Sequence, residues 1–115
     1  YQIALGDVAG ARESARAGLR AAQEVRAGLQ IAISLQHLAL LAALDGDARR
    51  GAQLLGYANA RYDHLGVQRE PAEQWGHDKL SAELRNALSE EEIAELTTEG
   101  ASWSEGRAVE EALRI

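Results

Sequence analysis

The chain has 115 residues, a formal net charge of −6 and no cysteine, so it is at most one domain, with neither disulfides nor thiolate metal sites. The acidic balance argues against broad binding to nucleic acids or anionic membranes. Polar residues interrupt its longest apolar run before that run reaches the ~18 residues needed to cross a bilayer. We therefore expect a cytoplasmic protein. Because the chain lacks methionine and opens at Tyr1, we also expect it to be a fragment of a longer protein.

Strong helix formers dominate the composition, with 23 alanines and 16 leucines, and no stretch has the alternating pattern of a strand. The predicted fold class is all-α. The Gly-Asp pairs at 6–7 and 46–47, Pro71, and Ser89 with Glu92 fit helix ends and starts. They place a short helical segment at 1–5 and helices at roughly 8–24, 27–45, 48–65, 71–88, 90–99 and 104–114. Because the connections are short, neighbouring helices are expected to pack as antiparallel hairpins.

The two Gly-Asp turns belong to an internal repeat. They lie 40 residues apart, and a small residue follows five positions after each glycine, at Ala11 and Gly51. A small side chain at this position allows the two helices of a hairpin to cross closely. We therefore expect close crossings at Ala11, Ala39 and Gly51.

This repeat resembles the tetratricopeptide repeat, a helical hairpin with a fixed pattern of large and small residues. The first helix of that motif matches Leu35, Leu38, Ala39 and Ala42, and the second matches Gly51, Leu55 and Ala58. The resemblance implies a right-handed solenoid of stacked antiparallel hairpins over residues 1–66, with the first helix truncated. Residues 67–115 would then be capping helices of the same domain, which hide the last apolar face.

A second set of signatures runs from the helix at 48–65 to the end of the chain. It comprises Leu54-Leu55-Gly56, His64-Leu65-Gly66, Pro71, Leu84-Arg85, Leu88-Ser89-Glu90, Ile93, Glu99-Gly100 and Glu110-Glu111-Ala112-Leu113. These resemble the C-terminal helical-repeat region of large bacterial signalling proteins. In that family a signalling ATPase core is joined to a LuxR-type or winged-helix DNA-binding domain, or to a cyclase domain. The chain departs from the family at Leu96-Thr97-Thr98, where Ala-Trp-Ala is usual, and has Trp103 instead.

The second resemblance implies a non-catalytic role in protein–protein interaction and regulation, within a multidomain transcriptional regulator or signalling ATPase. The expected partners are other domains of the parent protein or a separate protein, with no direct nucleic-acid contact by this segment. The alternative function is the sensing of a small-molecule effector by the same kind of regulator.

One polar stripe interrupts the otherwise apolar helix at 27–45. It consists, at helical spacing, of Arg26, Gln30, Ser34 and His37. Such a stripe is typically a solvent-facing strip, and the alternative is the floor of a groove for a ligand or peptide. The positions that line the concave groove of tetratricopeptide domains hold Ile33, Gln36, Leu40, Ala43 and Leu44. Because these are mostly apolar, capture of a peptide carboxylate is disfavoured, and the final helices are expected to fold back over them.

A second group of candidate residues surrounds the loop at 66–70. It consists of Tyr62, His64, Trp75 and His77. They either form the rim of an effector pocket or anchor the last hairpin to the repeat, as aromatic residues with one polar group often do. Together with the stripe, this group defines a candidate binding surface of Gln30, Ser34, His37, Tyr62, Trp75 and His77.

The sequence contains no motif for catalysis, metal binding or a cofactor. Asp63-His64 and His77-Asp78 are adjacent pairs that lack the spacing of ligands on one helix face. Neither a nucleophile elbow nor a phosphate-binding glycine loop occurs. Residues 89–115 carry 2 basic and 8 acidic side chains, a surface that suits either a basic partner or simple solvation of the chain end. We predict a protein that is not an enzyme.

Overall fold

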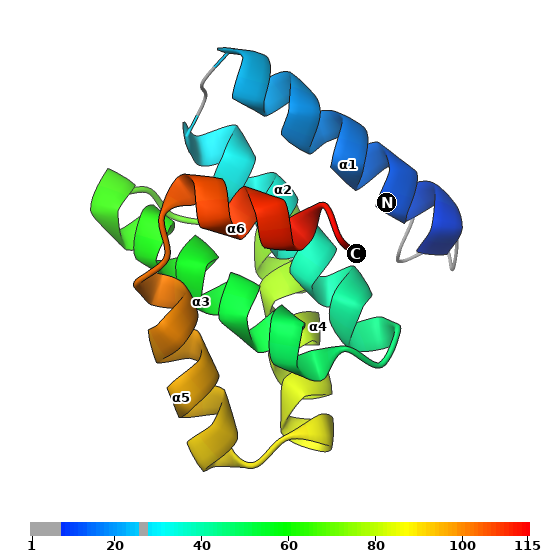
Figure 1. Cartoon of the computed structure of the whole chain (residues 1–115), viewed down its shortest axis with the longest axis vertical. Helices are drawn as coiled ribbons and strands as arrows, with labels where there is room; N and C mark the ends of the chain where they lie inside the picture. Colours follow the sequence, from blue (N-terminus) through cyan, green and yellow to red (C-terminus); the bar gives the residue numbers. More distant parts are fainter. Residues whose placement is uncertain (1–7, 26–27) are drawn as a thin grey trace.

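The computed structural model describes residues 8–25 and 28–115 (Figure 1). Within these ranges every regular element is a helix, so the all-α prediction is confirmed. The helices are α1 (Val8–Val25), α2 (Gly28–Leu44), α3 (Ala48–Leu65), α4 (Pro71–Ala87), α5 (Glu90–Ala101) and α6 (Glu105–Ala112). Each begins and ends within two residues of its expected range. The predicted segment at 1–5, the Gly6-Asp7 turn and Arg26 lie outside the described residues.

Local capping interactions explain why the helix boundaries were predictable. The side chain of Asp47 accepts a hydrogen bond from the backbone N–H of Arg50 at 3.2 Å and begins α3. Ser89 and Glu92 form a reciprocal capping box at the start of α5, with both bonds at 3.1 Å. Gly46, between α2 and α3, has φ of 93°, a left-handed conformation that glycine adopts without steric cost.

α2 and α3 form the centre of the domain. α2 contacts α1, α3, α4 and α6, and α3 contacts α4, α5 and α6 as well as α2. The two central helices cross closely, because a Cβ atom on Gly51 would lie 2.9 Å from the backbone oxygen of Ala39. The predicted crossing of Gly51 on Ala39 is therefore confirmed. None of the described helices has the length and apolarity needed to cross a bilayer.

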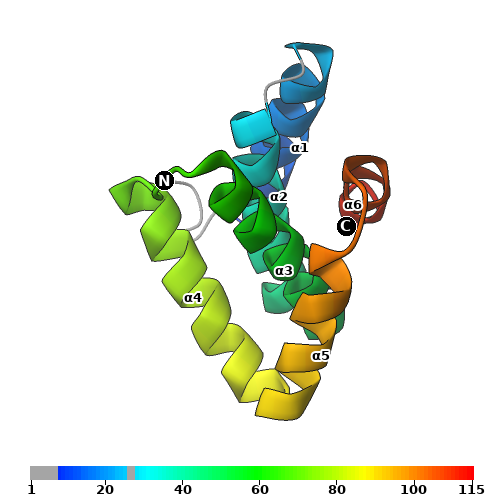
Figure 2. The same ribbon diagram turned by 90° about the vertical axis from the view of Figure 1, so that its left-hand side faces the viewer.

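α5 packs on α3 through two glycines. A Cβ atom on Gly56 of α3 would overlap the backbone of Thr97, and one on Gly100 of α5 would overlap the backbone of Gln53. The expectation that neighbouring helices pair as antiparallel hairpins is wrong for α5 and α6, which do not pack on each other, and for α4 and α5, which diverge from their common turn (Figure 2). They diverge because α3, rather than α4, supplies the close-packing surface for α5.

α4 and α6 lie on opposite sides of the central pair (Figure 2). α4 covers Gln36, since a Cβ atom on Gly76 would lie 3.4 Å from its side-chain nitrogen. α6 packs on α2 and α3 and buries Ala108, Val109 and Ala112. The final helices thus fold back over the central helices.

Candidate functional site

The polar stripe of α2 is not a uniform solvent-facing strip. Gln30 is exposed, whereas Ser34 is buried and faces α1, where a Cβ atom on Gly18 would lie 3.4 Å from its hydroxyl oxygen. His37 is partly buried near Glu73 of α4, and burial lowers the pKa of its imidazole while the carboxylate of Glu73 opposes that shift. Three residues predicted to share one surface therefore lie in three different environments.

The residues expected around the loop at 66–70 also differ in exposure. Tyr62 is 4% exposed and contributes almost no surface to a pocket rim, whereas Trp75 is 40% exposed on α4. His77 is partly buried, and its Nδ1 lies 3.4 Å from the carboxylate of Asp78. The structure therefore places Tyr62 inside the domain, Trp75 on its surface and His77 beside a neighbouring carboxylate.

Arg69, in the loop between α3 and α4, is the centre of a polar cluster that joins three helices. Its Nε donates to the side-chain oxygen of Gln36 at 2.6 Å, and its Nη2 donates to that of Asn59 at 2.5 Å. The guanidinium carbon lies 4.2 Å from the centroid of the Tyr62 ring, a cation–π contact. The amide of Gln36 completes the cluster by donating to the backbone oxygen of Glu73 at 2.7 Å. We call these five residues the Arg69 cluster.

The Arg69 cluster stabilises the fold rather than supplying reactive groups. Gln36 is fully buried in α2, and a buried amide is costly unless it is hydrogen bonded. Burial lowers the pKa of Arg69, and the carboxylates of Asp63 and Asp78 oppose that shift. Arg69 donates hydrogen bonds to two neutral amide oxygens. The cluster therefore holds the loop between α3 and α4 against α2 and α3.

Sequence reasoning missed the central role of Arg69 and Gln36, although signals for both were present. Gln36 is a polar interruption in the most apolar helix, and Arg69 stands two residues before Pro71 in a loop between two helices. Neither signal specifies a partner, because the two residues are far apart in the sequence and meet only through packing of α4 on α2. Tyr62 contacts Arg69, and its role as an anchor of the last hairpin stays a prediction.

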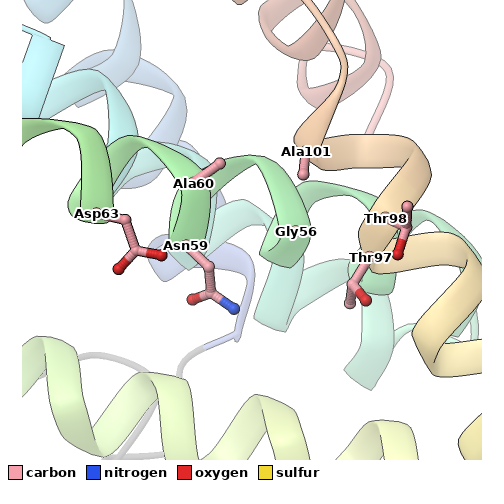
Figure 3. A pocket seen from close by; sticks show the side chains of 7 residues that line it. All are labelled: Gly56, Asn59, Ala60, Asp63, Thr97, Thr98 and Ala101. Carbon is pink, nitrogen blue, oxygen red and sulfur yellow. The ribbon is translucent and has the colours of Figure 1, made fainter.

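A shallow groove runs between α3 and α5 beside the Arg69 cluster (Figure 3). Its volume is about 270 Å³, and it is lined by Gly56, Asn59, Ala60, Asp63, Thr97, Thr98 and Ala101. Asn59 and Asp63 project from one side of α3, and the two threonines come from α5. The hydroxyl of Thr97 already donates to the backbone oxygen of Ile93 at 2.8 Å. The groove thus combines small residues with the amide of Asn59, two threonine hydroxyls and the carboxylate of Asp63.

The acidic C-terminal region is partly neutralised by α3. The guanidinium of Arg49 lies 3.5 Å from the carboxylate of Glu92, and that of Arg50 lies 3.7 Å from Glu111. These ion pairs join α3 to α5 and α6. Binding of a basic partner to residues 89–115 stays a prediction.

Within the described part of the chain, no group of three or more histidine and carboxylate side chains is arranged to hold a metal ion. No protein-family model matches the sequence, and comparison with curated proteins and with solved structures finds no match either.

Proposed function

We propose that this chain is a non-catalytic interaction and regulatory domain of a multidomain bacterial transcriptional regulator or signalling ATPase. In this proposal the chain is a tetratricopeptide-like right-handed solenoid of one and a half repeats, ended by capping helices. The proposal rests on the sequence signatures from Leu54 to Leu113 together with one feature of the packing. Two pairs of alternate helices pack on each other, α2 with α4 and α3 with α5, which is the order of contacts expected between successive units of a helical solenoid.

The glycines within the family-like signatures support this proposal. Gly56 and Gly100 both belong to those signatures, and they are the two positions where α3 and α5 approach most closely. A close approach of this kind fixes the angle between two stacked helices. The signatures are therefore consistent with a stacked arrangement that presents an extended surface to a partner.

The complete reading frame that encodes the chain tests this proposal. We expect it to contain a nucleotide-binding ATPase core upstream of Tyr1, together with a DNA-binding or cyclase domain. A frame with neither would overturn the proposed family. A frame that joins the chain to an unrelated enzyme would overturn the regulatory role as well.

The alternative function, effector sensing, is supported by the groove between α3 and α5. Its volume of about 270 Å³ is close to the lower limit of ~300 Å³ for ligand pockets, and Asp63 suits a cationic or hydroxyl-rich compound. A metabolite panel screened by thermal shift tests it. A compound that raises the Tm of the wild-type chain but not of Asp63→Ala would support effector sensing, and a panel without such a compound would count against it.

A further inference from the structure

α6 is the shortest helix of the described chain, with eight residues. It packs on α2 and α3 through a small apolar face of Ala108, Val109 and Ala112. A helix of this length is not stable by itself in water, so its packing maintains it. Because the buried side chains are small, α6 is held by less apolar surface than α2 or α3, which bury several leucines.

Polar contacts orient α6 at its edges. The carboxylate of Glu111, with a side chain only 13% exposed, lies 3.7 Å from Arg50 of α3 and also pairs with Arg107 and Arg114 at 3.4 and 3.6 Å. At the same C-terminal end of α6, Arg16 of α1 donates to the backbone oxygen of Leu113. The surface beneath α6 is therefore apolar, with an arginine from α3 and another from α1 at its margins.

α6 is a helical unit separate from α5. Residues 102–104 form a short turn, and Ser104 caps α6 by accepting a hydrogen bond from the backbone N–H of Arg107 at 3.1 Å. α6 thus has its own N-terminal cap and is not a continuation of α5. Trp103, in the turn, is partly buried against the core, and the guanidinium of Arg107 lies 4.8 Å from its ring centroid.

We propose that α6 is a releasable helix, and that the surface it covers on α2 and α3 binds an amphipathic helix of a partner protein when α6 is released. The features of α6 define the partner: alanine or valine on one face, a carboxylate that reaches Arg50, and a C-terminal turn that reaches Arg16. The inference rests on the proposed interaction role and deepens it by naming the surface and the class of ligand. Its test uses this chain alone, so its failure is distinct from failure of the reading-frame test.

Hydrogen exchange of the full chain, followed by mass spectrometry, tests whether α6 is released. We expect amides of α6 to exchange at least tenfold faster than those of α2 and α3, because local opening exposes them before global unfolding. Val109→Asp should accelerate exchange in α6 alone. Gly106→Ala, at an exposed position whose Cβ atom would meet nothing closer than 4.0 Å, should slow it by favouring the helix. Exchange of α6 together with α2 and α3, or global unfolding of the Val109→Asp chain, would overturn the proposal.

A synthetic peptide with the sequence of residues 104–115 tests the binding surface. In full chains that carry Trp75→Phe, the fluorescence of the remaining tryptophan, Trp103, reports binding of the peptide. The Val109→Asp chain should bind the peptide at least tenfold more tightly than the Gly106→Ala chain, because a tethered helix competes at high effective concentration. A peptide that itself carries Val109→Asp should bind neither chain. Equal binding to both chains, or none, would overturn the proposal. A molecular mass of the chain that is doubled in the absence of peptide would also overturn the proposal, because the surface would then bind α6 of a second copy.

Discussion

Gly56 and Gly100 determine how closely α3 and α5 approach, because each lies against the backbone of the opposite helix. We predict that Gly100→Ala lowers the free energy of unfolding by about 3 kcal/mol, since its methyl group forces the two helices apart. Urea unfolding followed by circular dichroism measures the change. Gly106→Ala is the matched control and should leave the stability unchanged or raise it by a few tenths of a kcal/mol, roughly. A Gly100→Ala chain as stable as the control would contradict the close packing.

Arg69 satisfies two amide oxygens at the junction of α2, α3 and α4. We predict that Arg69→Met lowers the free energy of unfolding by about 2 kcal/mol, because the buried oxygen of Gln36 loses its donor. Adding Gln36→Leu to that variant should recover part of the loss, since it removes the unsatisfied group. Arg49→Met, which removes an exposed ion pair with Glu92, should cost no more than about 0.5 kcal/mol. Equal effects of the two arginine substitutions would show that the Arg69 cluster adds nothing to stability.

His37 makes stability depend on pH. Burial lowers its pKa below the model-peptide value of 6.5, so the unfolded chain binds a proton more readily than the folded chain. Its stabilising contribution is fully present above pH 6.5 and is lost as the pH falls through 6.5 toward the lower pKa of the folded state. We predict that the free energy of unfolding decreases more steeply between pH 7.5 and 5.5 for the wild type than for His37→Gln, in equilibrium urea titrations at each pH. Parallel pH profiles would be inconsistent with this prediction.

At the level of single residues, the sequence identified capping residues and one helix crossing but not the Arg69 cluster. A cap such as Ser89 with Glu92 is readable because both residues lie in one short segment. The contact of Arg69 with Gln36 joins residues 33 positions apart and depends on where α4 lies. The positions of Arg69 and Gln36 in the sequence therefore could not predict that the two residues contact each other.

The helices themselves depend on local caps, and α5 provides a direct test. We predict that Ser89→Ala costs about 1 kcal/mol, because it removes the side-chain bond to the backbone N–H of Glu92. The backbone N–H and hydroxyl of Ser89 also lower the pKa of Glu92, so this part of the stability is present above pH 4.5 and is lost as the pH falls below it. Thermal unfolding measures the loss, with Thr98→Ala, at an exposed position of the same helix, as the control expected to stay within about 0.5 kcal/mol.

The order of the helices along the chain could be predicted from the sequence, but which helices pack against each other could not. α2 is apolar around most of its circumference, and it contacts four other helices. The short connection at 88–89 suggested that α4 and α5 pair with each other, but α5 packs on α3. Gly56 and Gly100 let α5 approach the backbone of α3 closely, so tertiary packing outweighs the proximity of α4 and α5 in the chain.

Across the whole molecule, the α2–α3 pair is the scaffold on which the other helices are arranged. α1 contacts α2, α5 contacts α3, and α4 and α6 contact both. Residues 89–115 carry the net charge, and ion pairs from Arg49 and Arg50 attach this region to α3.

We propose that this domain regulates a larger protein of which it is a part. The most direct measurement is ATP hydrolysis by the proposed parent ATPase, compared between the wild type and the Gly100→Ala and Gly106→Ala variants. If the packing of α5 on α3 transmits regulation, Gly100→Ala should change the ATPase rate several-fold, and Gly106→Ala should leave it as in the wild type. Identical rates for all three proteins, with the domain loosened only in Gly100→Ala, would contradict a regulatory role.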